Sequence, residues 1–96
     1  MKKTLTAAML LMAFNAYALD SKKFCAQLGA SAGGSSFMEM KCRDLEATAV
    51  LKIDSQKVPN QVLATCARQG DFMGGSYHAM SMCIDMELNA RKRLGK

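Results

Sequence analysis

The sequence predicts an all-α protein: two tandem helix-loop-helix hairpins, each linked by a disulfide, packed as a small four-helix domain. The first observation behind this prediction is an internal repeat at a constant offset of 41 residues. Both copies follow the pattern C-A-x-x-G-x-x-x-G-G-S-x6-C-x-D-x-E. The second is that all four cysteines lie inside the two copies, at matching places. The third is that apolar residues recur at helical spacing after each Gly-Gly-Ser.

Residues 1–18 have the features of a secretory signal peptide. Lys2 and Lys3 precede an apolar stretch of signal-peptide length, and Ala16-Tyr17-Ala18 supplies a small-x-small cleavage pattern. An N-terminal membrane anchor is the alternative, but the apolar run is too short to span a bilayer comfortably. We therefore expect a mature chain that begins at Leu19 and resides in the periplasm or outside the cell.

The mature chain would be a single small domain, residues 19–96, with repeat units 20–53 and 59–94. A chain of this size buries little surface, and exported domains commonly compensate with disulfides. Of 13 basic and 8 acidic residues, the signal peptide removes two lysines, which leaves a net charge of +3. This mild charge, together with export, argues against a nucleic-acid partner. The basic C-terminal residues from Arg91 onward are explained by a helix dipole, with an acidic partner or anionic membrane surface as the alternative.

Each repeat begins with a short helix that we expect to end at a glycine. Asp20 or Ser21 can cap the first of these helices, which would stop near Gly29. Pro59 suits the first turn of the matching helix, which would stop near Gly70.

A longer helix follows each Gly-Gly-Ser. Ser36 and Glu39 have the spacing of a capping box, and Ser76 holds the equivalent start in the second copy. The polar positions, including the Asp44-x-Glu46 pair, are expected to be solvated. We expect the hairpins to face each other across one core as a pseudo-twofold pair. The apolar stripes predicted along these helices are Met38, Cys42, Leu45, Ala49 and Ile53 in copy one, and Ala79, Cys83, Met86, Ala90 and Leu94 in copy two.

Symmetry about the glycine turns favours disulfides within each repeat. Residues equidistant from the turn of an antiparallel hairpin lie opposite each other, which pairs Cys25 with Cys42 and Cys66 with Cys83. Four cysteines allow three connectivities, and the other two stay open on sequence alone.

The sequence contains no set of residues with the spacing of a known catalytic site. Asp44-x-Glu46 and Asp85-x-Glu87 are paired carboxylates, but residues two apart on a helix point in different directions. The sequence has one histidine and no Cys-x-x-Cys motif. We predict a non-enzymatic protein without a cofactor; an enzyme whose site forms only in an oligomer is an alternative, with the Asp-x-Glu pairs as its suspects.

A cluster of soft ligands distinguishes the second copy. Thioethers and imidazole suit Cu(I) or Ag(I), so a periplasmic soft-metal binding protein is an alternative function. A core or an adaptable contact surface is the favoured interpretation of the methionines. The candidate metal ligands are Met73, His78, Met80, Met82 and Met86.

The predicted function is binding of another cell-envelope protein. Tyr77, His78 and Met80 lie at or near a helix start beside a glycine turn. At such a position the aromatic side chains of Tyr77 and His78 serve either as contact anchors or as staples that hold the loop to its helix. Replacing them is expected to weaken capture of the partner and to leave folding intact. In size, export and cysteine usage the chain resembles conjugation-system accessories and immunity proteins of the periplasm. That resemblance assigns no functional residue.

Overall fold

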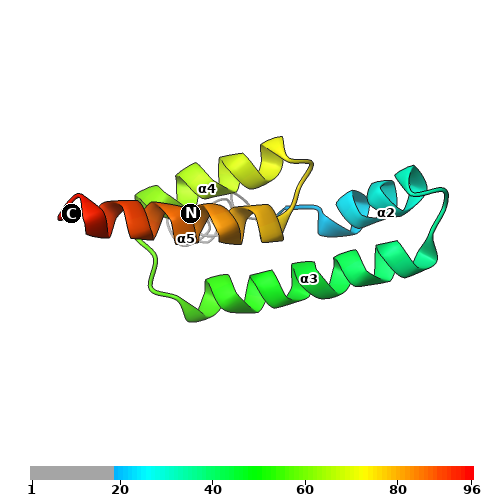
Figure 1. Cartoon of the computed structure of the whole chain (residues 1–96), viewed down its shortest axis with the longest axis horizontal. Helices are drawn as coiled ribbons and strands as arrows, with labels where there is room; N and C mark the ends of the chain where they lie inside the picture. Colours follow the sequence, from blue (N-terminus) through cyan, green and yellow to red (C-terminus); the bar gives the residue numbers. More distant parts are fainter. Residues whose placement is uncertain (1–18) are drawn as a thin grey trace, which may run out of the picture.

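The computed structural model describes residues 19–96, so the predicted signal segment 1–18 lies outside the described residues. The predicted all-α architecture of two disulfide-linked hairpins is confirmed (Figure 1). Within residues 19–96, no helix is both long enough and apolar enough to cross a membrane. The helices are α2 (Ser21–Ser31), α3 (Ser36–Ser55), α4 (Asn60–Phe72) and α5 (Tyr77–Arg93).

The long helix α3 joins the two hairpins. It packs against α2 within the first hairpin and against α5 of the second, while α4 packs on α5. Figure 1 shows α2 and α5 one after the other along the same side of α3. The second hairpin is therefore displaced along the length of the first rather than stacked squarely upon it.

Serine caps begin both long helices. The Oγ of Ser35 accepts a hydrogen bond from the backbone N–H of Met38 at 3.1 Å. The Oγ of Ser76 accepts the equivalent bond from Ala79, also at 3.1 Å. The first cap is thus one residue earlier than the predicted capping box, and Glu39 forms an ion pair with Arg43 instead of reaching back to the cap.

The short helices run past the glycines at which they were predicted to end. The residues with positive φ come later, in the Gly-Gly turns; φ is 76° at Gly33 and 98° at Gly74. Gly29 and Gly70 are instead buried within α2 and α4. A Cβ at Gly70 would lie 2.7 Å from the carbonyl oxygen of Ser76, so glycine is needed there for close approach of the next helix.

The two disulfides have the within-repeat connectivity that the sequence favoured. Cys25 is bonded to Cys42 and Cys66 to Cys83, with a Cα–Cα distance of 5.4 Å in both bridges. Each bridge ties the two helices of one hairpin together. In the chain-entropy description, a closed loop of this length contributes about 3 kcal/mol.

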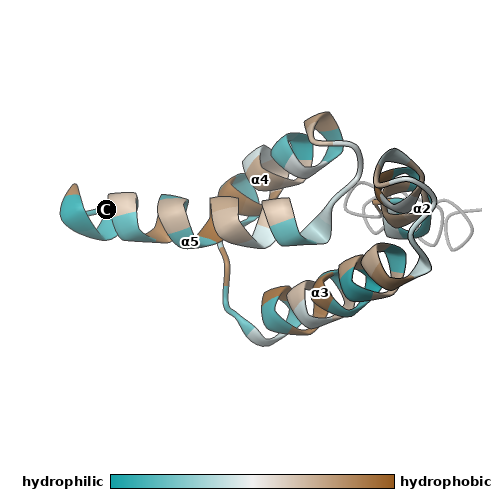
Figure 2. Ribbon diagram, turned by 45° about the vertical axis from the view of Figure 1, so that its right-hand side comes forward, coloured by the Kyte–Doolittle hydropathy of each residue, from teal (hydrophilic) through white to brown (hydrophobic). Residues whose placement is uncertain are grey.

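Burial is unequal between the repeats. The buried apolar cluster belongs to the second hairpin, and Ile53, Leu19 and Val58 pack against it. The predicted stripes are only partly buried: Leu45 is 54% exposed and Met86 is 70% exposed. The stripes were centred on the cysteines, which face the other helix of their own hairpin. The cluster consists of Val62, Cys66, Ala67, Met80 and Ile84. Figure 2 shows the hydropathy of each helix.

Candidate functional site

Glu46 connects the two hairpins. Its side chain projects from the middle of α3 and is 3% exposed. The carboxylate accepts hydrogen bonds from Ser76 Oγ at 2.8 Å and from the backbone N–H groups of Tyr77 and His78 at 2.6 and 3.0 Å. The prediction of a solvated Glu46 is therefore wrong.

The start of α5 explains why a carboxylate is buried there. The first N–H groups of a helix have no partner within the helix, and the helix dipole places partial positive charge at that end. The Oγ of Ser76 accepts a hydrogen bond from one of these groups, and the Ser76 hydroxyl donates a hydrogen bond to Glu46. Glu46 satisfies two more, so the desolvated charge is compensated by three donors.

The segment before α2 completes the contact with the second hairpin. The backbone N–H of Leu19 donates to the Tyr77 hydroxyl at 2.9 Å. A Cβ built at Gly75 would lie 3.3 Å from the carbonyl oxygen of Asp20, and one at Gly74 would lie 3.1 Å from the ring of Phe24. The first hairpin thus receives the Gly-Gly-Ser turn of the second, and we call this contact the hairpin junction.

Only the first repeat uses its glutamate in the hairpin junction. Glu87 has the same place in the second repeat as Glu46 in the first, and it is exposed. Under a pseudo-twofold, Glu87 would hold the start of α3 in return. The expected pseudo-twofold is therefore wrong. Corresponding helices instead run in the same sense along the long axis, with one hairpin displaced from the other (Figure 1).

An apolar groove lies beside the hairpin junction. It has a volume of about 210 Å³. The first hairpin supplies most of its lining, and Ser76 and His78 supply the edge from α5. Leu28 is 40% exposed, Met38 42% and Leu45 54%. We call this feature the junction groove; its lining residues are Phe24, Leu28, Met38, Lys41, Cys42, Leu45, Glu46, Ser76 and His78.

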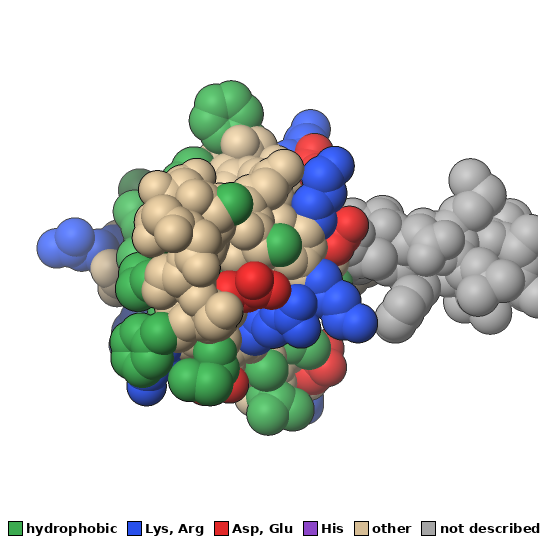
Figure 3. All heavy atoms as spheres, turned by 90° about the vertical axis from the view of Figure 1, so that its right-hand side faces the viewer, with side chains coloured by type: hydrophobic (Ala, Val, Ile, Leu, Met, Phe, Trp, Pro, Cys, Tyr) green, Lys and Arg blue, Asp and Glu red, His purple; other side chains and the backbone are tan. Residues whose placement is uncertain are grey.

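More apolar side chains are exposed around the start of α3. Phe37 is 61% exposed and Met40 52%. The ammonium group of Lys41 lies 5.6 Å from the centroid of the Phe37 ring. Figure 3 looks onto the end of the molecule formed by the α2–α3 turn, where hydrophobic side chains gather on one side and basic side chains on the other.

The three residues predicted to bind a partner occupy different environments. Met80 is 1% exposed and belongs to the buried cluster, so a partner cannot reach it in this conformation. Tyr77 is half-buried, with its hydroxyl engaged by Leu19. His78 is exposed and lines the junction groove, so it is the member of the predicted set that a partner can contact.

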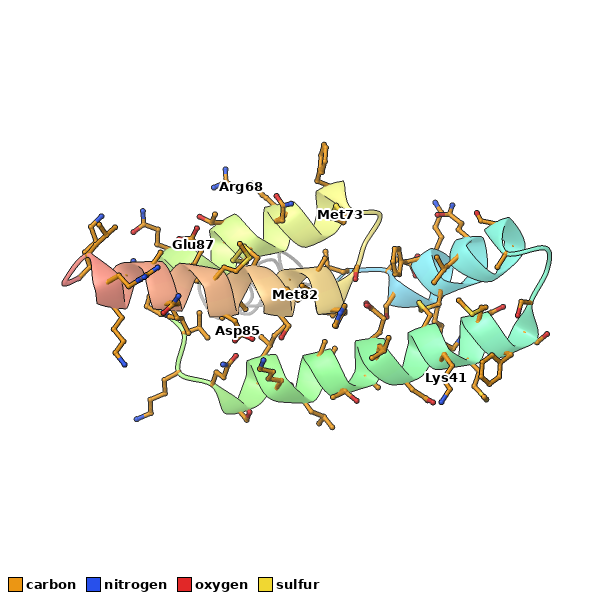
Figure 4. All side chains as sticks on the ribbon, in the orientation of Figure 1. Lys41, Arg68, Met73, Met82, Asp85 and Glu87 are labelled. Carbon is orange, nitrogen blue, oxygen red and sulfur yellow. A yellow bond between two sulfur atoms is a disulfide. The ribbon has the colours of Figure 1, made fainter. Side chains whose placement is uncertain are left out.

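The methionine cluster is likewise divided. Met73 is 51% exposed, Met82 55% and Met86 70%, whereas Met80 is in the core. Figure 4 shows Met82 on α5 and Met73 at the end of α4. His78, Met82 and Met86 share an exposed face of α5 at four-residue steps. Within residues 19–96, no group of three or more His, Cys, Asp or Glu residues is placed to hold a metal ion.

The members of each Asp-x-Glu pair point apart. Asp44 is exposed while Glu46 is buried. Asp85 extends toward α3, where it forms an ion pair with Lys52 (Figure 4). The hydrogen bond from Lys52 holds the pKa of Asp85 below its usual value. A hydrogen bond from the Gln56 side-chain amide also lowers this pKa, whereas partial desolvation raises it. Glu87 lines a separate hollow with residues of α4.

The junction groove and the role of Glu46 were not predicted from the sequence. Met38 and Leu45 belong to the apolar stripe predicted along α3, and no signal in the sequence indicates that these two members of the stripe stay exposed. Glu46 carried no local signal, because Glu87 has the same surroundings in the sequence. The chain matches no protein-family model, and neither the curated proteins nor the solved structures contain a significant match to it.

Proposed function

We propose that this protein is a small exported, non-enzymatic helical protein that binds another cell-envelope protein, in the manner of an accessory or immunity-type factor. The junction groove is the observation that carries the proposal. It gathers exposed apolar side chains of α2 and α3 at the point where the two hairpins meet. Contiguous exposed apolar surface of this kind commonly marks a protein contact.

The groove has fixed walls. Cys42 lies in its lining and is bonded to Cys25, which holds α2 and α3 at a set separation. Glu46 and Ser76 lie in the same lining and are hydrogen-bonded to each other across the hairpins. A preformed groove loses little conformational freedom on binding, which favours affinity from a small area.

The chemistry of the lining suggests an amphipathic helix as the ligand. Such a helix would place apolar side chains between Leu28 and Leu45. Lys41 in the lining favours an acidic residue beside those anchors. His78 at the α5 edge would add a polar contact, in keeping with the site predicted from the sequence.

Two features support an envelope location. Residues 1–18 have the sequence features of a signal peptide, and the described part of the chain contains two disulfides and no free cysteine. Disulfides persist in oxidising compartments, so the bridges are consistent with an extracytoplasmic site.

Site-specific photo-crosslinking in the native host tests the proposal. A photo-reactive residue at Leu45 should give one discrete adduct, because Leu45 lines the groove and is half-exposed. Leu51 is the matched control: it is also on α3, is 71% exposed and does not line the groove. The adduct should form at position 45 and not at position 51.

Substitution completes this experiment. Leu45→Asp should abolish the adduct formed from a crosslinker at position 28, while Leu51→Asp should leave it unchanged. Equal crosslinking at positions 45 and 51, or an adduct that survives Leu45→Asp, would show that the groove is not the binding surface.

A second candidate function is Cu(I) or Ag(I) binding on α5. It is favoured by the exposed alignment of His78, Met82 and Met86 on one helix face. Competition titration should then show one equivalent of metal, lost on His78→Ala combined with Met82→Leu. Absence of competition with a chelator probe would reject this function.

A further inference from the structure

We propose that the protein associates head to tail with further copies of itself, the α2–α3 turn of one copy docking into a hollow around Glu87 of the next. The turn is Gly33 to Phe37, and we call it the free turn. The hollow lies between α4 and α5, has a volume of about 190 Å³, and we call it the Glu87 hollow. This contact is separate from the junction groove and from the proposed envelope partner.

The hairpin junction is the template for the contact. There, the first hairpin receives the second through Asp20, Phe24 and Glu46. The repeat offset of 41 residues carries these positions to Gln61, Thr65 and Glu87. All three line the Glu87 hollow. The second hairpin thus displays, at the other end of the molecule, the surface that the first hairpin uses internally.

Burial distinguishes the used surface from the free one. Glu46 is 3% exposed and Ala49 is 4% exposed, because the second hairpin covers them. Their repeat equivalents, Glu87 and Ala90, are both exposed and both line the hollow. The equivalent surface on the second hairpin is therefore uncovered within residues 19–96.

The free turn is the matching half of the template. A Cβ at Gly34 would meet no atom of residues 19–96 within 4 Å, whereas one at the equivalent Gly75 meets the backbone of Asp20. Ser35 caps α3 through the same bond with which Ser76 caps α5, so its hydroxyl group can donate to a carboxylate as that of Ser76 does.

The start of α3 also lacks a carboxylate partner. At the hairpin junction, Glu46 accepts from the backbone N–H groups of the first two residues of α5. The equivalent N–H groups, those of Ser36 and Phe37, donate no hydrogen bond within residues 19–96. Glu87 of a neighbouring copy has the charge and the repeat position to accept from them.

Sequence differences between the two surfaces predict a weak contact. Thr65 replaces Phe24, so the Glu87 hollow is less apolar than its template. The internal junction also benefits from an effective concentration of order millimolar, which separate copies lack. We expect a dissociation constant between about 10 µM and 1 mM for the contact between two copies. A heterologous contact does not close after two copies, so growth continues past the dimer.

Sedimentation velocity of the exported, oxidised protein tests the proposal. The wild type should show an average mass that rises with concentration beyond that of a dimer. Glu87→Lys should weaken association at least tenfold, because it sets an ammonium group against a helix N-terminus. Gly34→Asn should do the same, because its side chain meets the hollow while asparagine tolerates the positive φ of 78°.

Mixing the two variants gives a specific signature. Glu87→Lys retains the free turn, and Gly34→Asn retains the hollow. An equimolar mixture should therefore form a one-to-one dimer that grows no further. Asp44→Lys is the matched control, because it makes the same charge change at an exposed carboxylate outside the hollow. Asp44 is the repeat equivalent of Asp85, and the Asp44→Lys variant should associate like the wild type.

Several results would overturn the proposal. They are a wild-type protein that stays monomeric at 1 mM, variants that each associate like the wild type, and a mixture that remains monomeric. Loss of self-association on Leu45→Asp with retention on Glu87→Lys would assign it to the junction groove instead. Because Glu87 lies outside the junction groove, Glu87→Lys should capture an envelope partner to the same extent as the wild type, so failure of one proposal is distinct from failure of the other.

Discussion

Glu46 and Glu87 occupy the same position of the repeat, and Glu46 alone is bonded to a helix start within residues 19–96. Glu46 receives three hydrogen bonds from the first residues of α5 and their cap. Glu87 is exposed and lines an open hollow. The pair therefore separates the effect of a glutamate on its own helix from its effect on a second hairpin.

Replacement of Glu46 should destabilise the fold, with Glu87 as the internal control. Glu46→Ala leaves a serine hydroxyl and two helix N–H groups without their acceptor, which should cost about 2–4 kcal/mol in the free energy of unfolding. Glu87→Ala should cost less than about 0.5 kcal/mol. Urea denaturation at a protein concentration where the chain is monomeric measures both. Equal losses would show that Glu46 acts only within α3.

Gly70→Ala should destabilise the protein although alanine is the better helix former. Helix propensity favours alanine by about 1 kcal/mol. The added methyl group, however, would lie 2.7 Å from the Ser76 carbonyl oxygen and 2.8 Å from Leu19 Cδ1. A net loss of about 1–3 kcal/mol is expected. Gly29→Ala should cost less, since its closest approach is 3.0 Å. A stabilised Gly70→Ala would mean that α4 and α5 can separate without penalty.

Removal of the two disulfides should have different effects on which helices stay protected from hydrogen exchange. The first hairpin buries few apolar side chains beyond Cys25, Cys42 and Ala49, while the second retains a buried cluster without its bridge. Cys25→Ser with Cys42→Ser should therefore release α2 and leave α4 and α5 protected. Each bridge should contribute about 3 kcal/mol to global stability. Hydrogen exchange resolved by segment makes the comparison; uniform loss of protection in both double variants would contradict it.

Truncation of two methionines on the same helix should change the stability of the protein by very different amounts. Met80 is 1% exposed, so Met80→Ala should open a cavity and cost about 2–5 kcal/mol. Met82 is 55% exposed, and Met82→Ala should change stability by less than about 0.5 kcal/mol. Thermal unfolding followed by circular dichroism measures the difference. A Met80→Ala protein as stable as the wild type would place Met80 outside the core.

The ion pair between Lys52 and Asp85 should make a small, acid-sensitive contribution. Because the pKa of Asp85 is lowered in the folded state by the Lys52 hydrogen bond, the pair stabilises the protein above the unfolded-state pKa of 3.8. That contribution is lost as pH falls through the lower folded-state pKa. The pair is half-exposed, so about 0.2–1 kcal/mol is expected, less at high salt.

A double-mutant cycle measures this coupling. The cycle uses Asp85→Asn and Lys52→Met, with urea denaturation at pH 6 and at pH 2.5. The coupling energy should be smaller at pH 2.5 than at pH 6, because protonation of Asp85 removes the charge that Lys52 binds. A coupling of the same size at both pH values would show that the two side chains interact through packing rather than charge.

Local features of the fold were predictable because they depend on residues close together in sequence. The Ser76 cap, the glycine turns and the pairing of Cys25 with Cys42 follow from a hairpin geometry that occurs in both repeats. The cap of the first long helix was predicted one residue too late, because Ser35 and Ser36 are adjacent. The exact ends of α2 and α4 were not predictable. Gly29 and Gly70 resemble helix terminators, and their real constraint is the approach of the following helix.

The relation between the hairpins was not predictable from the repeat. The repeat makes Glu46 and Glu87 alike, while the junction uses one of them and leaves the other exposed. The core face of α5 was likewise misplaced. Met80 and Ile84 are buried there, because the interior lies beside the stripe through Cys83 rather than along it. Long-range placement of this kind leaves no periodic trace in a single sequence.

The order of the cysteines along the chain bears on how the protein acquires its bonds. Each bridge joins a cysteine to the next one in sequence, Cys25 to Cys42 and Cys66 to Cys83. In a chain that emerges from a translocation channel N-terminus first, the first pair meets before the second pair has arrived. If the protein is exported as proposed, pairing of the cysteines in their order of arrival would by itself give the native connectivity.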